Sequence, residues 1–343
     1  MFTANDVTVV IPSLDGDNDK LRETVRSVLT NSPKRVVLVT TDANVEKAEK
    51  AFSHVSKSID IYSIPKANKR RQLCKALPLV TTEITILADD DVSWPPNLLQ
   101  WMLAPFEDER MGGVGTNQRL RREESPNVWN WLGAAYLIRR NWDCTACEYM
   151  DGGLPCLSGR TVAYRTHIIR DPDFIHSFTH ETWQSCQLNA DDDNFLTRWM
   201  VNHGWKTWIQ YHRDCEVQTT LEDNSKYLLQ CLRWARSNWR SNLKSLFVEW
   251  TVWRYVCPCD PVAASLRRSC RRGYTAVQGL RMYWLTQSRA TDDILGVPSP
   301  SSKPRYPAGR SYTMLPCCAS FGKSPLLWPS PYAKSLEPSL HFG

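Results

Sequence analysis

Two runs of three aspartates are the residues of this chain best suited to do chemistry. The first, Asp89-Asp90-Asp91, directly follows the apolar run EITILA. Adjacent carboxylates repel one another unless a cation or hydrogen bonds relieve them, and Mg²⁺ and Mn²⁺ prefer such oxygen ligands, often together with substrate phosphates. In an extended segment Asp89 and Asp91 point the same way, which predicts a metal and diphosphate site. The alternative is a solvated acidic turn.

The second run, Asp191-Asp192-Asp193, stands where a helical pattern begins. Carboxylates at a helix start bind its free N–H groups and interact favourably with the helix dipole, which accounts for one or two of the three. A remaining acid beside an active site can act as a general base that removes a proton from an acceptor hydroxyl. Both interpretations stay open on the sequence alone.

A long helical pattern carries a third candidate group. Gln230, Arg233 and Trp234 are spaced i, i+3 and i+4, so they share one helix face. An arginine can hold a phosphate with two parallel hydrogen bonds, and an indole ring can stack on a ligand. Packed amphipathic helices show the same pattern without any ligand. Lys69, in the basic stretch 66–71, can neutralise a diphosphate or simply begin a solvated helix.

Other site signatures are missing or incomplete. The chain has no G-x-x-x-x-G-K-[ST] sequence, and the GGVG at 112–115 does not complete G-x-G-x-x-G, which argues against P-loop and dinucleotide-binding enzymes. Cys144 and Cys147 form a lone C-x-x-C without a second pair. We therefore expect unligated thiols there rather than a zinc site.

The elements that must position these residues alternate between strand and helix. Short apolar runs at 7–12, 36–41, 59–65 and 83–88 are separated by helical patterns, which predicts β-α-β units and a mostly parallel sheet. Ligands of such sheets bind at the carboxyl ends of the strands, where the first acidic run stands. Further along, helices are predicted over 127–140, 191–203 and about 225–254, with a strand at 206–211.

Charge and composition divide the chain into two parts. Its 343 residues are 42% hydrophobic with a formal net charge of +6, an ordinary globular composition. The excess charge lies in residues 256–343, whereas acids and bases balance to within one charge over 1–255. The C-terminal part also holds 11 of the 21 prolines, which predicts an irregular or disordered tail. It contains no recognisable nucleic-acid-binding module, so no nucleic-acid partner is predicted.

Several motifs stand in order over residues 7–250: VTVVIPSLDGD, the Asp-x-Asp within ADDDV, SGRTVAYR, DDDNFLTRW and QCLRW. Together they resemble the processive family 2 glycosyltransferases, which include hyaluronan, chitin and cellulose synthases, and especially fungal hyaluronan-synthase-like polysaccharide synthases. QCLRW is similar to the family's Q-x-x-R-W. The resemblance implies an α/β GT-A-like fold with a Rossmann-type, mostly parallel sheet and flanking helices. It also implies inverting transfer of a sugar from a UDP-sugar.

For the donor, the resemblance assigns Asp42 to the uridine pocket and Lys69 to the diphosphate. Asp89 and Asp91 match the Asp-x-Asp that holds Mg²⁺ or Mn²⁺ on the UDP, and Asp89 counts as a nucleotide-sugar ligand as well. The helix motif would close over the nucleotide through three residues: Gln230, Arg233 and Trp234.

For the acceptor, the resemblance assigns Asp193 as the catalytic base, with Asp192 beside it. Ser158 and Gly159 match a small-residue loop beside the acceptor sugar, which Trp234 also borders. The implied partners are a UDP-sugar donor, with GlcNAc, GlcA or Glc as the sugar, and a growing polysaccharide. Two alternatives remain: a non-processive transferase acting on a lipid or protein, and a non-catalytic relative that binds a UDP-sugar.

Family members carry transmembrane helices on both sides of the catalytic domain, which implies a membrane location with that domain on the cytoplasmic side. This chain has no run of about 18 apolar residues, so by itself it is expected to be peripheral or soluble. Residues 236–255 pair a basic stripe (Arg236, Arg240, Lys244) with an apolar one, which predicts a helix lying on a membrane surface. In the alternative, the apolar stripe packs on the catalytic domain.

The predicted domains are a catalytic domain over 1–235, an amphipathic interfacial helix over 236–255 and a basic Pro/Ser-rich tail over 256–343. The family pattern calls for a membrane span after the interfacial helix, where this chain has the tail instead. We therefore expect a truncated reading frame or a splice variant.

Overall fold

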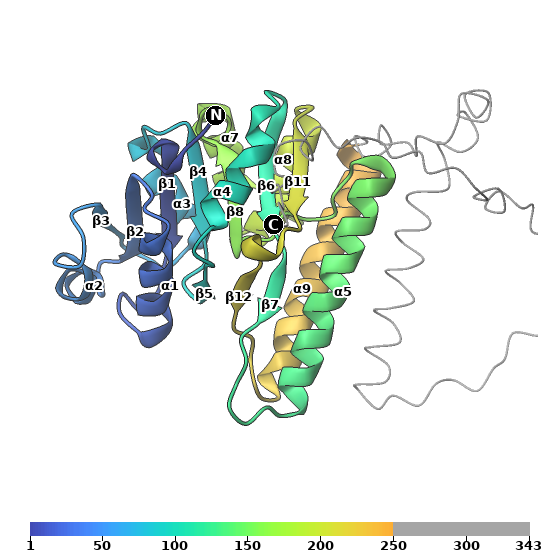
Figure 1. Ribbon diagram of the computed structural model, residues 1–343. Helices are drawn as coiled ribbons and strands as arrows, with labels where there is room; N and C mark the ends of the chain where they lie inside the picture. The colour runs from blue at the N-terminus through green and yellow to red at the C-terminus, as the bar shows by residue number, and fades with distance from the viewer. Residues whose placement is uncertain (250–343) are drawn as a thin grey trace, which may run out of the picture. The chain divides into compact units, whose positions relative to one another are not determined.

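A seven-stranded sheet forms the centre of the computed structural model, which describes residues 1–249 (Figure 1). Its strand order is β11-β6-β8-β4-β1-β2-β3. All neighbours pair in parallel except β8, which runs antiparallel to both β4 and β6. The strands are β1 (Val7–Pro12), β2 (Arg35–Thr41), β3 (Ile59–Ile64), β4 (Ile84–Ala88), β6 (Met111–Thr116), β8 (Thr161–Arg165) and β11 (Lys206–Gln210).

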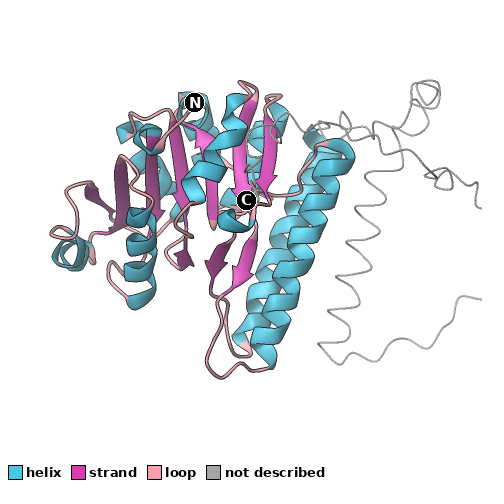
Figure 2. Ribbon diagram, viewed as in Figure 1, coloured by secondary structure: helices cyan, strands magenta, loops and turns pink. Residues whose placement is uncertain are grey.

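Helices cover both faces of this sheet (Figure 2). The strands are apolar on both sides because alternate residues enter two separate cores: Val9 and Ile11 of β1 lie in one, and Val10 lies in the other. The first core is closed by α1 (Asp19–Thr30), α2 (Val45–Phe52) and α4 (Leu98–Leu103). The second is closed by α3 (Lys69–Ala76), α6 (Thr166–Ile169), α7 (Pro172–His180) and α8 (Asp192–Asn202). The predicted α/β fold is confirmed.

Within residues 1–249, two smaller sheets and four short 3₁₀ turns complete the fold. In the three-stranded sheet, β12 (Val217–Thr219) lies between β5 (Val92–Ser93) and β7 (Gln118–Leu120), antiparallel to the first and parallel to the second. This pairing brings the segments that follow β4, β6 and β11 together. The remaining pieces are β9 (Thr182–Trp183), β10 (Cys186–Gln187), η1 (Ala4–Asp6), η2 (Leu77–Leu79), η3 (Ala104–Glu107) and η4 (Arg213–Cys215).

Two long helices, α5 (Val128–Asp151) and α9 (Lys226–Lys244), lie side by side (Figure 1). Ring pairs join them: Tyr136 stacks on Trp234 with a centroid distance of 4.9 Å, and Trp129 lies 6.5 Å from Tyr227. Helix α5 continues well beyond the predicted end at residue 140. Helix α9 stops at Lys244, followed by a π-helical turn at Ser245–Glu249.

The predicted domain division stays a prediction. Its boundary at 235/236 falls inside the continuous helix α9, and the predicted tail over 256–343 lies outside the described residues. None of the helices described within residues 1–249 is long and apolar enough to cross a membrane.

Glu148 is a buried carboxyl group that joins α5 to β11. It accepts a hydrogen bond from the Ile209 N–H at 3.0 Å and another from the Tyr211 hydroxyl. Burial raises the pKa of Glu148 to about 8, although both hydrogen bonds oppose that rise. The folded protein therefore holds a proton on Glu148 at neutral pH, whereas the unfolded chain releases it.

Because the folded state binds this proton more tightly, the free energy of unfolding should fall by on the order of 1 kcal/mol per pH unit between about pH 5 and pH 8. Glu148→Gln offers an acceptor to the same donors without titrating, so its stability should change less over that window. Urea unfolding of both proteins across the window measures the difference. Parallel pH profiles for the two proteins would contradict this account of Glu148.

Candidate active site

The carboxyl ends of β1, β2 and β4 meet at one edge of the sheet, and each is followed by a polar residue. Ser13 follows β1, Asp42 follows β2, and Asp89-Asp90-Asp91 follows β4. The Ser13 hydroxyl donates a hydrogen bond to Asp90 Oδ2 at 2.7 Å. Asp90 is therefore turned toward β1, while Asp89 and Asp91 contact other groups. Asp42 is exposed at the end of β2.

Lys69 links this edge to the second acidic run. Asn68 caps α3 by accepting the Arg71 N–H at 3.1 Å, so the helix begins at Lys69. The Lys69 ammonium lies 2.7 Å from Asp89 Oδ1 and 2.9 Å from Asp192 Oδ2. Burial opposes the charge on Lys69, but Asp192 and Asp89 outweigh it and raise the pKa of the ammonium. Lys69 thus stays charged between two carboxylates that lie far apart in the sequence.

The three acids at the start of α8 have three different environments. Asp191 has a left-handed backbone, with φ of 65°, and its carboxylate is bound by Arg240 at 2.6 Å. Burial acts to raise the pKa of Asp192, but the neighbouring Lys69 more than offsets this and lowers the pKa. Burial and the charge of Asp192 raise the pKa of Asp193. Of the neighbours Asp192 and Asp193, Asp193 is therefore the one that binds a proton more tightly, which suits a general base.

Arg160 contacts the first acidic run. It was not among the predicted site residues. Its carbonyl accepts the Asp89 N–H at 3.0 Å. Its guanidinium donates to Gln118 Oε1 at 2.7 Å and to Thr219 Oγ1 at 3.1 Å. The signal for it was its place directly after Gly159 in SGRTVAYR, but its partners come from β7 and β12, whose pairing the sequence did not reveal.

Asp91 has a surplus of negative charge around it. Its Oδ2 accepts a hydrogen bond from the Thr220 hydroxyl at 3.1 Å. Burial, together with the charge of Asp89, raises the pKa of Asp91 to about 6 even though Arg160 acts in the opposite direction. A divalent cation between Asp89 and Asp91 would remove this conflict, since each carboxylate has a second oxygen beyond its bond to Lys69 or Thr220.

The donor set therefore fits a hard divalent cation such as Mg²⁺ or Mn²⁺. Within residues 1–249, no group of three or more His, Cys, Asp or Glu side chains is arranged to hold an ion by itself. Asp89 and Asp91 would supply two ligands, and the others would come from water or ligand phosphates. Magnesium sites that use one or two carboxylates with substrate phosphates follow this scheme.

Gly159 lies against the Lys69–Asp192 pair. A Cβ added at Gly159 would lie 3.0 Å from Lys69 Nζ and 3.4 Å from Asp192 Oδ2. Any side chain at this position would therefore press on the ion pair. Ser158, immediately before it, is partly buried. The predicted small-residue loop thus adjoins the acid at the start of α8.

Of the Gln230, Arg233 and Trp234 group on α9, only part contacts a residue beside the acidic run that follows β4. Trp234 lies beneath the Arg160 guanidinium, 5.4 Å from the ring centroid, which connects α9 to the Asp91 neighbourhood. Gln230 instead accepts the Glu222 N–H at 3.4 Å. Arg233 is exposed. Of the three predicted residues on this helix, Trp234 is the one that reaches a group beside the acids.

The predicted basic stripe on α9 does not form one free face, which corrects part of the expectation for residues 236–255. Arg240 binds Asp191, and the Lys244 ammonium lies 2.8 Å from Glu181. Both bases therefore turn toward the body of the protein, and Arg236 is the exposed member of the three. The reason is that buried acids on neighbouring elements need cationic partners.

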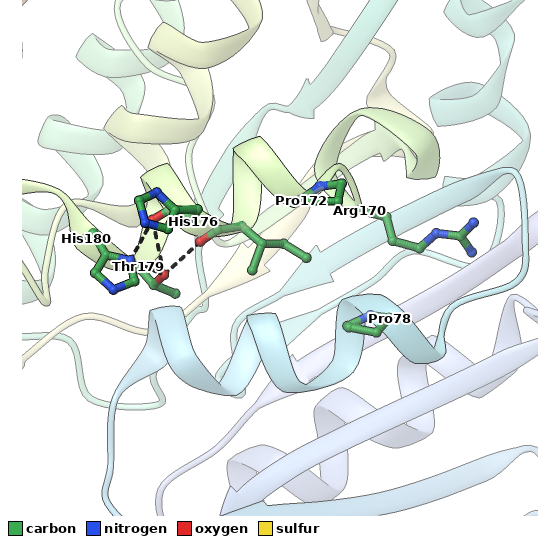
Figure 3. A pocket seen from close by; sticks show the side chains of 7 residues that line it. Pro78, Arg170, Pro172, His176, Thr179 and His180 are labelled. Atoms are coloured by element: carbon green, nitrogen blue, oxygen red, sulfur yellow. Dashed lines mark hydrogen bonds between the residues drawn. The ribbon is translucent and has the colours of Figure 1, made fainter.

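A separate hollow of about 550 Å³ lies between η2 and α7 (Figure 3). Its lining is mainly apolar and includes none of the predicted site residues: Pro78, Arg170, Pro172, Ile175, His176, Thr179 and His180. Figure 3 shows His176, Thr179 and His180 tied to one another by hydrogen bonds. The acid cluster therefore stands apart from this hollow.

Comparison with known proteins gives a family for most of the described chain. The family model described as "Glycosyltransferase like family 2" matches residues 4–237. A type 2 glycosyltransferase of Zymoseptoria tritici is 56% identical over 253 residues, which cover 74% of this chain and 54% of that protein. A hyaluronan synthase of Streptococcus pyogenes is 24% identical, covering 73% of this chain and 63% of that protein. The chain spans about half the length of the first of these relatives.

The fold also matches a solved structure. A mannosyltransferase from Pyrobaculum calidifontis, in complex with GDP-Man and Mn²⁺, aligns with a TM-score of 0.52 over 84% of this chain and 80% of that protein. The sequences are 16% identical, so the likeness concerns the arrangement of strands and helices.

Proposed function

This chain belongs to glycosyltransferase family 2, and on that premise we propose that it transfers a sugar from a UDP-sugar to a carbohydrate acceptor with inversion. The match over residues 4–237 confirms the prediction of a family 2 glycosyltransferase, and the processive, hyaluronan-synthase-like subgroup is part of the proposal. The donor we propose is UDP-GlcNAc, UDP-GlcA or UDP-Glc, and the acceptor is a growing polysaccharide. The reaction requires Mg²⁺ or Mn²⁺.

The observation that carries this proposal is the position of Lys69 between Asp89 and Asp192. One carboxylate belongs to the Asp-x-Asp segment after β4, and the other is the neighbour of Asp193. A donor diphosphate and an acceptor hydroxyl must meet within a few ångströms for transfer to occur. By contacting both Asp89 and Asp192, Lys69 holds the segment proposed for the donor within a few ångströms of the segment proposed for the acceptor.

On the donor side, Asp89 and Asp91 would hold Mg²⁺ or Mn²⁺ together with the diphosphate. The cation, when bound, supplies positive charge that stabilises the UDP leaving group. Lys69 adds a fixed ammonium beside Asp89, and a charge already in position costs no reorganisation during the reaction. Trp234, held under Arg160, would border the acceptor sugar. Asp42 is proposed for the uridine pocket at the end of β2.

On the acceptor side, Asp193 removes the proton from the attacking hydroxyl. The hydroxyl oxygen forms a bond to the anomeric carbon while the bond from that carbon to the UDP oxygen breaks, and UDP leaves with the electron pair. Attack opposite to the leaving group converts an α-linked donor into a β-linked product. The raised pKa of Asp193 suits this role, because a more basic carboxylate accepts a proton more effectively.

A donor screen tests the function as a whole. The protein is incubated with each UDP-sugar and Mg²⁺ or Mn²⁺, and both UDP release and product length are followed. Release of UDP with a long product supports the proposed polymerisation. Single additions would identify a non-processive transferase, and binding of UDP without release would identify a non-catalytic relative.

Asp193→Asn should reduce transfer by at least about 100-fold, because loss of a general base typically costs 10²–10⁴ in rate. Binding of UDP with Mn²⁺ should stay within about twofold, since Asn fills the same space. Titration calorimetry and initial rates measure the two effects. Asp19→Asn, at an exposed acid in the first turn of α1, is the matched control and should change neither. Wild-type turnover in Asp193→Asn would remove Asp193 from the base role.

Asp91→Ala should weaken Mn²⁺-dependent binding of UDP by at least about tenfold, because one of two protein ligands to the cation is lost. Binding measured with EDTA in place of Mn²⁺ should change little. Asp90→Asn is the control in the same segment, since its side chain can still accept the Ser13 hydrogen bond. If Asp90→Asn impaired Mn²⁺-dependent binding as strongly as Asp91→Ala, the proposed ligand pair would be wrong.

We also propose that the exposed faces of α5 and α9 bind a membrane surface. Trp131 and Trp142 on α5 are 69% and 71% exposed, and Trp239 on α9 is also exposed. Indole rings favour the boundary between water and lipid. The exposed large apolar residues of these two helices are Val128, Trp131, Ile138, Trp142, Tyr149, Leu229, Leu232 and Trp239, and two more, Phe247 and Val248, lie in the turn at Ser245–Glu249.

Replacing both Trp131 and Trp142 with Ser should lower partitioning into phosphatidylcholine–phosphatidylserine vesicles by at least about tenfold, since each buried indole contributes well over 1 kcal/mol. Flotation of the vesicles measures the bound fraction. The double variant Leu14→Ser with Val55→Ser removes two exposed apolar residues elsewhere and should bind as the wild type does. Equal losses in both variants would exclude a specific membrane face.

A further inference from the structure

Arg70, next to Lys69 on α3, is buried with 1% of its surface exposed. Its guanidinium donates to the Ala190 carbonyl at 2.7 Å and to the Asp191 carbonyl at 3.2 Å. It also donates to the Phe178 carbonyl at 2.8 Å. These acceptors are at the end of α7 and in the turn that leads into α8. Arg70 therefore fastens the backbone directly before Asp192 and Asp193.

Glu181 holds Arg70 in this orientation. Its Oε2 accepts from Arg70 at 2.8 Å, while Oε1 accepts from Arg198 of α8 and Lys244 of α9. The carboxylate is 3% exposed, and a buried charge of this kind is stable only with ionic partners. One acid thus joins α3, α8 and α9 behind the start of α8.

The turn itself has a left-handed backbone. Asp191 has φ of 65°, a conformation that few residue types other than Gly, Asn and Asp adopt. The surrounding contacts hold it there: Arg70 on the Asp191 carbonyl and Arg240 on the Asp191 carboxylate. This backbone geometry sets the direction from which Asp192 and Asp193 enter the cluster.

We propose that Arg70 is a positioning residue for the catalytic base, acting through the turn at Ala190 and Asp191. The guanidinium fork holds two successive carbonyls, and this fixes the first turn of α8 so that Asp193 faces the acceptor while Asp192 faces Lys69. Glu181 orients the fork, and Arg240 holds the turn from the side of α9. The proposal rests on the proposed transferase function, in which Asp193 is the base.

The test compares Arg70→Lys with Arg198→Lys. Both arginines are buried, bind Glu181 and lie over the ring of Phe195, at 5.3 Å and 5.8 Å. Arg198, however, binds Ser241 and Glu249 instead of the turn. Lysine keeps the charge in each case but lacks the rigid planar fork of five N–H donors, so it cannot reproduce the arginine's contacts in one fixed geometry. Measurements are kcat and KM for the UDP-sugar, the Kd for UDP with Mn²⁺, and the melting temperature.

Arg70→Lys should lower kcat by about 10- to 100-fold, the cost of misplacing a reacting group by about 1 Å, with KM and the Kd for UDP within about twofold. Arg198→Lys should keep kcat within about threefold of the wild type at a comparable melting temperature. If Arg70→Lys does not fold, Arg240→Lys replaces it, with the same expected loss of kcat at unchanged KM.

Wild-type kcat in Arg70→Lys would overturn the proposal, as would equal losses in both arginine variants that follow their melting temperatures. Asp193→Asn is assayed in parallel, so that failure of the positioning proposal can be distinguished from failure of the proposed transferase function. An inactive Asp193→Asn with a fully active Arg70→Lys rejects positioning alone. An active Asp193→Asn, or a wild-type protein that transfers no sugar, rejects the proposed function and the positioning proposal with it.

Discussion

The contact of one ammonium group with two carboxylates is the interaction around which the acid cluster is built. Lys69 binds Asp89 and Asp192, and Asp91 and Asp193 stand beside these partners. Lys69 and the nearby Arg160 supply two positive charges to four acids, and burial together with the neighbouring carboxylates raises the pKa values of Asp91 and Asp193. Acids held at this density favour a divalent cation on one side and a proton on the other. The proposed arrangement, a metal-assisted donor site next to a general base, meets both demands.

The fold supplies this density by combining distant segments. Asp89 follows a central strand, Lys69 opens the helix that leads from β3 toward β4, and Asp192 begins a helix more than a hundred residues later. Along each parallel strand, apolar side chains point alternately into the two cores, and this fixes the register of the strands. The packing of the cores therefore determines where the carboxyl ends of the strands lie. The loops that carry the charges therefore need few contacts of their own. Those present, such as Ser13 on Asp90, decide which way each side chain turns.

The sheet, its apolar strands and the start of α3 were predictable from the sequence, because each depends on local periodicity and short apolar runs. The separate environments of Asp191, Asp192 and Asp193 were not, since they depend on one left-handed residue and on Arg240 from a distant helix. Arg160 was overlooked for a similar reason: its partners belong to β7 and β12, two three-residue strands with no sequence signature. The C-terminal half of α5 was not predicted because its outward face is apolar as well, and apolar residues on both faces obscure the helical repeat.

Helix α9 connects the two sides of the cluster. Near its middle, Trp234 lies under Arg160 beside the Asp-x-Asp segment. Further along, Arg240 and Lys244 bind Asp191 and Glu181, next to the start of α8 that carries the proposed base. A helix is stiff over this length, because successive backbone hydrogen bonds join every turn to the next. Any displacement of α9 would therefore act on the proposed donor site and on the base together. Arg240 and Lys244, which the sequence suggested for a free surface, instead join the proposed acceptor side to the same rigid helix that carries Trp234.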